Sequence, residues 1–131
     1  MISYPITLDG VTYSTLHVNK LTRSFAVEDG PNAGRVNTGA MDRDIIGTYY
    51  NYHAEIDADA ASREEYDAFF WAISAPVDSH TLVVPFAQST LTFQAYVTQG
   101  QDELTFMEDA ANRWGDLSFN FIAMAPQRTP E

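Results

Sequence analysis

The sequence predicts a mainly β, antiparallel fold, either a β-sandwich or a small barrel, with one α-helix packed on it. Most of its patterned segments alternate apolar and polar residues with a period of two, as half-buried strands do. Short turn-forming stretches join many of these segments, and short connections favour antiparallel pairing. Only residues 62–74 show the helical period. The 131 residues suit one domain, so residues 1–131 are expected to fold together.

The N-terminal 21 residues are expected to form a β-hairpin. Residues 2–8 alternate, and Pro5 would confine this strand to a sheet edge or an irregular start. Asp9-Gly10 is a strong signal for a two-residue turn. Residues 11–21 would then supply the second strand.

Residues 26–44 are unlike their surroundings. They contain three of the seven glycines and few large apolar residues. Two interpretations stay open: a long surface loop, or a β-arm that becomes ordered only against a neighbouring subunit. Long loops in small domains are usually functional or mobile.

Residues 45–56 give the longest strand signal. The even-numbered positions are expected to face the core, because successive strand residues point to opposite faces. These core positions are Tyr50, Tyr52, Ala54 and Ile56.

The helix predicted over residues 62–74 has one apolar face. Its apolar residues fall at i, i+3, i+4 and i+7. They are Tyr66, Phe69, Phe70 and Ile73. Ser62 and Glu65 have the spacing of a capping box. Pro76 is expected to end the helix, because the residue before a proline avoids the α region.

The C-terminal half returns to strands. Residues 81–86 and 90–98 are expected to pair through a connection at 87–89, and residues 117–124 would form the last strand. Alternation predicts which residues of the last two strands point inward. They are Leu91, Phe93, Ala95, Val97, Leu117, Phe119, Phe121 and Ala123. Residues 100–114 are ambiguous between strand and a helical turn.

The composition excludes several classes of function. Eighteen acidic residues against seven basic ones give a net charge of −11, which argues against sequence-specific nucleic-acid binding and against docking on an anionic membrane. The chain has no cysteine, so thiolate metal sites, disulfides and cysteine nucleophiles are excluded. No signal-peptide pattern and no 18-residue apolar run occur, so no membrane insertion is expected.

Candidate catalytic and metal-binding residues do not form a recognised pattern. His17, His53 and His80 are far apart, and ordinary surface or interface roles are expected for them. Asp42 with Asp44, and Asp57 with Asp59, lack the further oxygen ligands of a calcium loop, so solvated turns or helix capping by Asp59 are favoured. No catalytic, cofactor-binding or metal-binding residue is therefore predicted, and no cofactor.

Two further groups of residues could suggest ligand binding, but a structural role is favoured for both. Gly30, Gly34 and Gly39 lack the spacing of a phosphate-binding loop. The cluster of Tyr49, Tyr50 and Tyr52 could stack sugars or bases, but packing in the core and at an interface is favoured.

Four stretches nevertheless resemble small tail proteins encoded by prophages and siphophages of Gram-positive bacteria. Together they span nearly the whole chain after residue 42, with gaps between them. They are RDIIGTYYNY (43–52), EYDAFFWAISAPVDSHTLVVP (65–85), FQAYVT (93–98) and WGDLSFNFIAMAPQRTP (114–130).

The order strand, helix, hairpin and closing strand also resembles the tail-tube fold. Tail tube proteins share this fold with the N-terminal ring domain of distal tail proteins. The resemblance implies hexameric rings whose strands join between subunits, an arm that reaches a neighbour, and a commonly acidic lumen that lets DNA pass.

The expected function is that of a non-enzymatic virion protein of the tail or baseplate. The protein is expected to form a homo-oligomeric ring and to contact other tail proteins. The virion would be assembled in the cytoplasm of the host. The alternative is an adaptor, such as a head–tail connector or tail-completion factor, that binds a larger phage protein. A small carbohydrate-binding module, with Tyr49 and Trp71 as its platform, is a third possibility.

Overall fold

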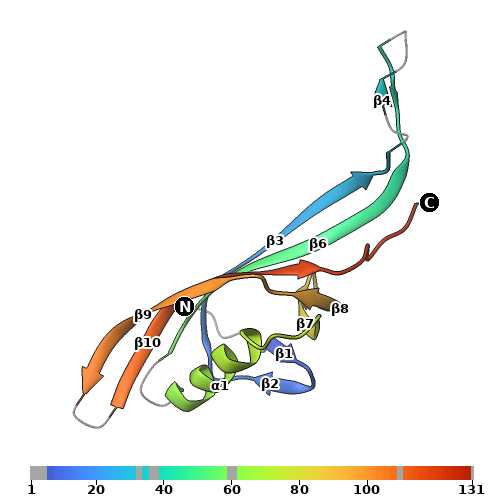
Figure 1. The fold of residues 1–131 in the computed structure, drawn as a ribbon. Coiled ribbons are helices and arrows are strands. Elements are labelled where there is room, and N and C mark those ends of the chain that lie inside the picture. Colours follow the sequence, from blue (N-terminus) through green and yellow to red (C-terminus); the bar gives the residue numbers. More distant parts are fainter. Residues whose placement is uncertain (1–5, 32–33, 36–38, 59–61, 109–110, 131) are drawn as a thin grey trace.

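The computed structural model describes residues 6–31, 34–35, 39–58, 62–108 and 111–130. The strands are β1 (Ile6–Leu8), β2 (Val11–Tyr13), β3 (His17–Asp29), β4 (Gly34–Arg35), β5 (Met41–Asp42), β6 (Ile45–Asp57), β7 (His80–Phe86), β8 (Ser89–Tyr96), β9 (Gly100–Glu108) and β10 (Ala111–Ala123). The helix α1 spans Arg63–Ile73. The predicted mainly β fold with one helix is confirmed over these residues (Figure 1).

Eight strands form one antiparallel sheet in the order β2-β1-β7-β8-β10-β6-β3, with β9 on β10, and β4 and β5 form a separate two-stranded sheet. β10 belongs to two layers, because residues 117–121 pair with β6 and residues 122–123 pair with β8. We call β3, β6, β10 and β9 the long sheet. The path is open at β2 and β3, so the described strands bend into two layers and do not close into a barrel.

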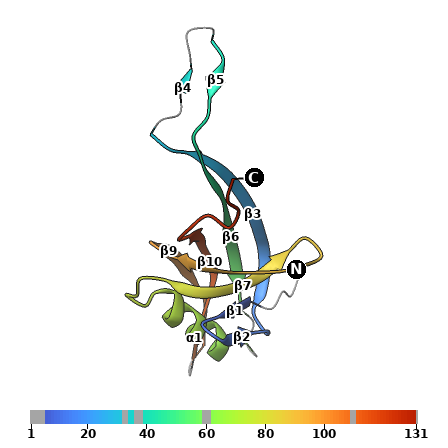
Figure 2. The ribbon, with the colours of Figure 1, turned by 90° about the vertical axis from the view of Figure 1, so that its right-hand side faces the viewer.

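The core lies between the long sheet and a second layer made of β1, β2, β7, β8 and α1 (Figures 1 and 2). Tyr52 and Phe93 stack across it with ring centroids 6.0 Å apart. Phe69 of α1 lies 5.8 Å from Phe119 and 5.0 Å from Tyr13, measured between ring centroids. The helix and the β7–β8 hairpin therefore cover neighbouring parts of the same face.

The helix buries the predicted face, with Phe70 only half-buried and the other three residues buried. The predicted capping box is wrong. Ser62 occupies the N-cap position but makes no side-chain capping bond. The Glu65 carboxylate instead accepts a hydrogen bond from the Thr15 backbone N–H at 2.9 Å, which ties the helix to the segment between β2 and β3.

The N-terminal hairpin is shorter than predicted. β1 and β2 pair around the expected Asp9-Gly10 turn, and Asp9 adopts a positive φ of 52°. The expected second strand is divided, because the chain from His17 onward pairs with β6 and leaves the hairpin. Residues 2–5, including Pro5, lie outside the described residues.

Residues 26–44 contain strands over part of their described length, so the interpretation of this segment as a long loop is wrong there. β3 and β6 stay paired out to Asp29 and Ile45. Beyond them the Gly30 N–H donates to the Asp44 carbonyl, and β4 pairs with β5. We call residues 26–44 the arm. Figures 1 and 2 show β4, β5 and the adjoining ends of β3 and β6 extending away from the two-layer body.

Residues 100–114 are strand wherever they are described. β9 and β10 pair from Glu108 and Ala111 back to Gly100, so β10 starts six residues before the predicted position 117. The helical turn considered for residues 108–112 is therefore wrong at its described positions. The ladder shifts register between Gly115 and Ser118, where Asp116 has a φ of 53° and its N–H donates to Asp57 Oδ1 at 2.7 Å.

Candidate functional site

Two rows of polar residues cross the long sheet on the face opposite the core. Directly paired residues of an antiparallel ladder point to the same face. The first row is Lys20, Glu55, Ser118 and Gln101, and the second is Thr22, His53 and Asn120. We call this the polar face. It continues at Ser24, which is opposite Asn51.

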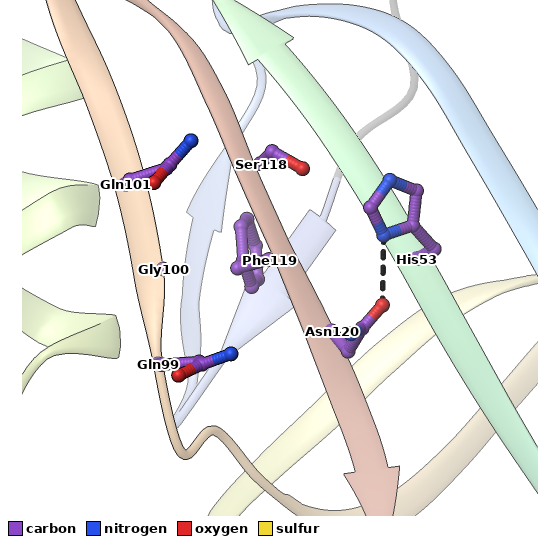
Figure 3. Close-up of a pocket in the computed structure, with 7 residues that line it drawn as sticks. All are labelled: His53, Gln99, Gly100, Gln101, Ser118, Phe119 and Asn120. Carbon is purple, nitrogen blue, oxygen red and sulfur yellow. Dashed lines mark hydrogen bonds between the residues drawn. The ribbon is translucent and has the colours of Figure 1, made fainter.

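The polar face contains a shallow pocket of about 280 Å³ (Figure 3). It is lined by His53, Gln99, Gly100, Gln101, Ser118, Phe119 and Asn120. The glycine allows close packing here, because a Cβ at position 100 would lie 3.0 Å from the Phe119 Cβ. Phe119 is itself buried in the core. The accessible chemistry of the pocket is thus mainly amide, hydroxyl and imidazole.

Neighbouring polar groups hold the His53 ring in place. Its Nδ1 lies 2.7 Å from Asn120 Oδ1, and its Nε2 lies 3.3 Å from Glu55 Oε2 (Figure 3 shows the first contact). A general base must lie within hydrogen-bond reach of the group that it activates. Both ring nitrogens of His53 are directed at side-chain oxygens other than that of Ser118. The arrangement therefore orients an imidazole in a polar lining and does not present a serine–histidine pair.

The net charge of −11 is not concentrated on the two rows. They hold one lysine, one glutamate and otherwise neutral polar side chains. Such a surface can hydrogen-bond to water and to polar groups. It lacks the clustered cations that replace phosphate counterions in nucleic-acid-binding proteins.

The long sheet ends in two strands that pair on one side only. Within the described residues, β3 pairs with β6 alone and β9 pairs with β10 alone. β3 has 13 residues and β9 has nine. Exposed strands of this length present unpaired backbone groups that another chain can use.

The core face of the long sheet extends beyond the layer that covers it. Phe25 and Val27 point to the same side as Tyr50 and Thr48, opposite which they pair. Phe25 is 71% exposed and Val27 is 40% exposed. A cavity of about 380 Å³ lies here, where the Arg23 guanidinium sits 5.0 Å from the Phe86 ring centroid.

The structure separates the three histidines. His17 lies in β3 opposite Asp57, and His53 lies in the polar face. The surface or interface role expected for His80 is wrong, because His80 is only 3% exposed. Its burial is possible because Nδ1 donates to Asp9 Oδ2 at 2.7 Å. The bond from His80 lowers the pKa of Asp9.

The paired aspartates serve structural contacts where they are described. Asp57 accepts hydrogen bonds from the Asn19 side chain and the Asp116 N–H. Asp44 accepts the Gly30 N–H through its backbone carbonyl. Asp59 lies outside the described residues, and its capping role stays a prediction. The described residues contain no group of three or more histidines and carboxylates placed to hold a metal ion.

The tyrosine cluster divides between the core and its margin. Tyr52 is buried and its hydroxyl donates to the Pro85 carbonyl at 2.9 Å, while burial raises its pKa. Tyr50 packs edge-to-face on Phe86, with ring centroids 5.1 Å apart. Tyr49 is half-buried against the core. Of the two residues considered for a sugar platform, only Trp71 is strongly exposed, at 81%.

A search for membrane-spanning helices among the described residues finds none that is long and apolar enough. The chain matches no protein-family model, and no curated protein matches it significantly.

Proposed function

We propose that this protein is a non-enzymatic structural subunit of a bacteriophage tail or baseplate, and that it assembles into a ring, with a hexamer favoured. The observation that carries the proposal is the long sheet, which has two free edges on opposite sides and a polar face between them. The resemblance to tail-tube proteins gives the phage context and the preferred ring order.

We infer that neighbouring subunits join by pairing the edge strands of their long sheets. β3 of one subunit can pair with β9 of the next, because among the described strands each has one unpaired side. Such a contact joins two different surfaces and is therefore heterologous. Heterologous contacts generate closed rings when the rotation between subunits closes.

The two faces of the long sheet favour a ring with a polar interior. The polar face would line the lumen, and its neutral rows would give passing DNA few cations to bind. The uncovered residues Phe25 and Val27 would be buried by a neighbouring subunit. Burial of apolar surface is worth roughly 25 cal/mol per Å².

Engineered disulfides test the edge contact directly. The protein has no cysteine, so each introduced thiol is unique. We would pair Thr22→Cys or Ser24→Cys on β3 with Gln101→Cys or Glu103→Cys on β9, so that the four pairs sample different registers of the contact. Oxidation of a correct pair should give a ladder of linked subunits in denaturing gels. Each single-cysteine variant is the matched control and can give dimers at most.

The native oligomer is measured in parallel by light scattering and negative-stain electron microscopy. Rings, with a ladder that stops at the ring size, would support the proposal. A monomeric mass across the concentration range, together with no ladder from any of the four cysteine pairs, would overturn it.

The second candidate is a phage adaptor that binds a larger partner. The cavity beside Arg23 favours it, because Phe25, Tyr50 and Phe86 line this cavity and a different protein could also fill it. Limited proteolysis of the arm distinguishes the ring proposal from the adaptor proposal. Protection that appears on self-assembly favours the ring, whereas protection that needs a heterologous phage protein favours the adaptor.

A further inference from the structure

A third pocket lies between the helix and the β9–β10 ribbon, away from the polar face. It is lined by Asp67 and Phe70 of α1, Asp102 of β9 and Trp114 of β10. Its volume is about 220 Å³. Pockets for drug-sized ligands span about 300–1,000 Å³. This one has the size for a single side chain.

The carboxylates give the pocket a negative potential. Asp102 accepts a hydrogen bond from the Tyr66 hydroxyl at 2.9 Å through Oδ2, and its Oδ1 has no hydrogen-bond partner within the part of the chain that the structure describes. Asp67 is exposed, and it carries no ion pair among the described residues. Burial raises the pKa of Tyr66, and the negative charges of Asp102, Asp57 and Asp67 raise it further.

The aromatic lining adds a second feature of cation sites. Trp114 is 37% exposed, and Phe70 is half-buried. Aromatic faces attract cations, Trp most strongly, and a planar guanidinium can stack on them while donating to carboxylates. Trp71 follows Asp67 by four residues and so lies on the same side of the helix, where it is 81% exposed.

We propose that this pocket binds an arginine side chain presented by a protein partner. The guanidinium would stack on Trp114 and donate hydrogen bonds to Asp67 and Asp102. The net charge of −11 would steer a basic partner toward the protein at low ionic strength. The inference does not require ring assembly. Asp102 belongs to β9, whose edge the ring contact would use, but the pocket is lined by α1, β9 and β10 of a single chain.

The probe is acetyl-arginine N-methylamide, and its citrulline analogue is the neutral control of nearly equal shape. In the Trp71→Phe protein, the indole N–H signal of Trp114 is the only tryptophan reporter. The arginine compound should move this NMR signal saturably. The citrulline compound should move it little at the same concentrations.

The carboxylates are tested by Asp67→Asn with Asp102→Asn. Asparagine at 102 keeps an oxygen acceptor for Tyr66, so the variant removes charge and preserves the bond. Binding should weaken about tenfold or more, as expected for the loss of two charged acceptors. Asp78→Asn, an exposed site outside the pocket, should leave binding unchanged.

Three results would overturn the inference: equal shifts with the citrulline compound, a shift that rises linearly without saturation, or unchanged binding in the double variant. If the double variant does not fold, Asp67→Asn alone still decides, because its site is exposed on the helix. Unchanged arginine binding in that single variant would remove Asp67 from the site and contradict the proposal.

Discussion

The Nδ1 atom of His80 lies 2.7 Å from Asp9 Oδ2, although the two residues are 71 positions apart. The other oxygen of Asp9 accepts the Thr81 backbone N–H at 2.8 Å, and the Asp9 N–H donates to the Thr81 carbonyl at 2.8 Å. One turn residue thus satisfies a buried imidazole and fixes the β1–β2 turn to the start of β7.

The first prediction concerns Asp9→Asn. Asparagine tolerates the positive φ at this position, so the change mainly removes the charge. Loss of the charge-assisted bond should lower the free energy of unfolding by about 1 kcal/mol at pH 7, a figure kept small because Asp9 is partly exposed. Denaturant unfolding of both proteins measures the difference, with exposed Asp78→Asn as the control.

The pH dependence of this difference has a definite sign. The hydrogen bond from His80 lowers the pKa of Asp9 in the folded protein. Its contribution is therefore fully present above the ordinary aspartate pKa of about 3.9 and is lost as the pH falls through the lower folded value. The two unfolding curves should converge at acid pH. A constant gap from pH 7 into the acid range would contradict the assignment.

Tyr66→Phe tests the buried hydroxyl of the helix. The variant loses the bond to Asp102, which should cost about 1 kcal/mol near neutral pH. Burial and Asp102 raise the pKa of Tyr66, so the wild type should lose stability once the unfolded chain ionises above about pH 10. The variant should show a shallower alkaline decline, measured by unfolding from pH 8 to 11. Equal alkaline slopes would refute this prediction.

Local patterns predicted the element types and the buried faces. Alternation identified Leu117, Phe119 and Phe121 as inward residues, and all three are buried. The helical period likewise identified Phe69 and Ile73. These predictions succeed because the period of a strand or helix decides which side chains share one face, and the apolar face is the one that packs into the core.

Long-range partners could not be predicted in the same way. His53 meets Asn120 across 67 positions, and Glu65 meets Thr15 across 50. The capping box failed because a tertiary acceptor contact took the Glu65 carboxylate away from the helix start. The polar face was missed for a related reason, since its rows exist only once the register of four strands is set.

Gly47→Ala tests the contact between β6 and the C-terminal segment. Gly47 has a φ of 155°, and a Cβ there would meet the Arg128 carbonyl and lie 2.7 Å from the Pro126 Cβ. The variant should lose about 2–4 kcal/mol of stability, or expose the segment after β10 to carboxypeptidase. Gly34→Ala is the matched control, because nothing lies within 4 Å of its added Cβ. Equal stability and equal carboxypeptidase sensitivity of the two variants would show that the contact at Gly47 does not stabilise the protein.

The last prediction compares two phenylalanines on the core face of the long sheet. Phe121 is fully buried beside Phe119, with ring centroids 4.8 Å apart, whereas Phe25 is 71% exposed. Phe121→Ala should cost about 3–5 kcal/mol, as for other buried aromatic truncations. Phe25→Ala should change the stability of the dilute protein by less than about 0.5 kcal/mol.

Protein concentration separates intrinsic stability from assembly in this pair. If a neighbouring subunit covers Phe25, the wild type should gain stability as concentration rises, because association favours the folded state by mass action. Phe25→Ala should weaken that gain. Phe121→Leu, a milder core change, should lower stability at every concentration and leave the gain in place. A Phe25→Ala protein that keeps the full concentration dependence would show that this exposed ring is not part of the assembly contact.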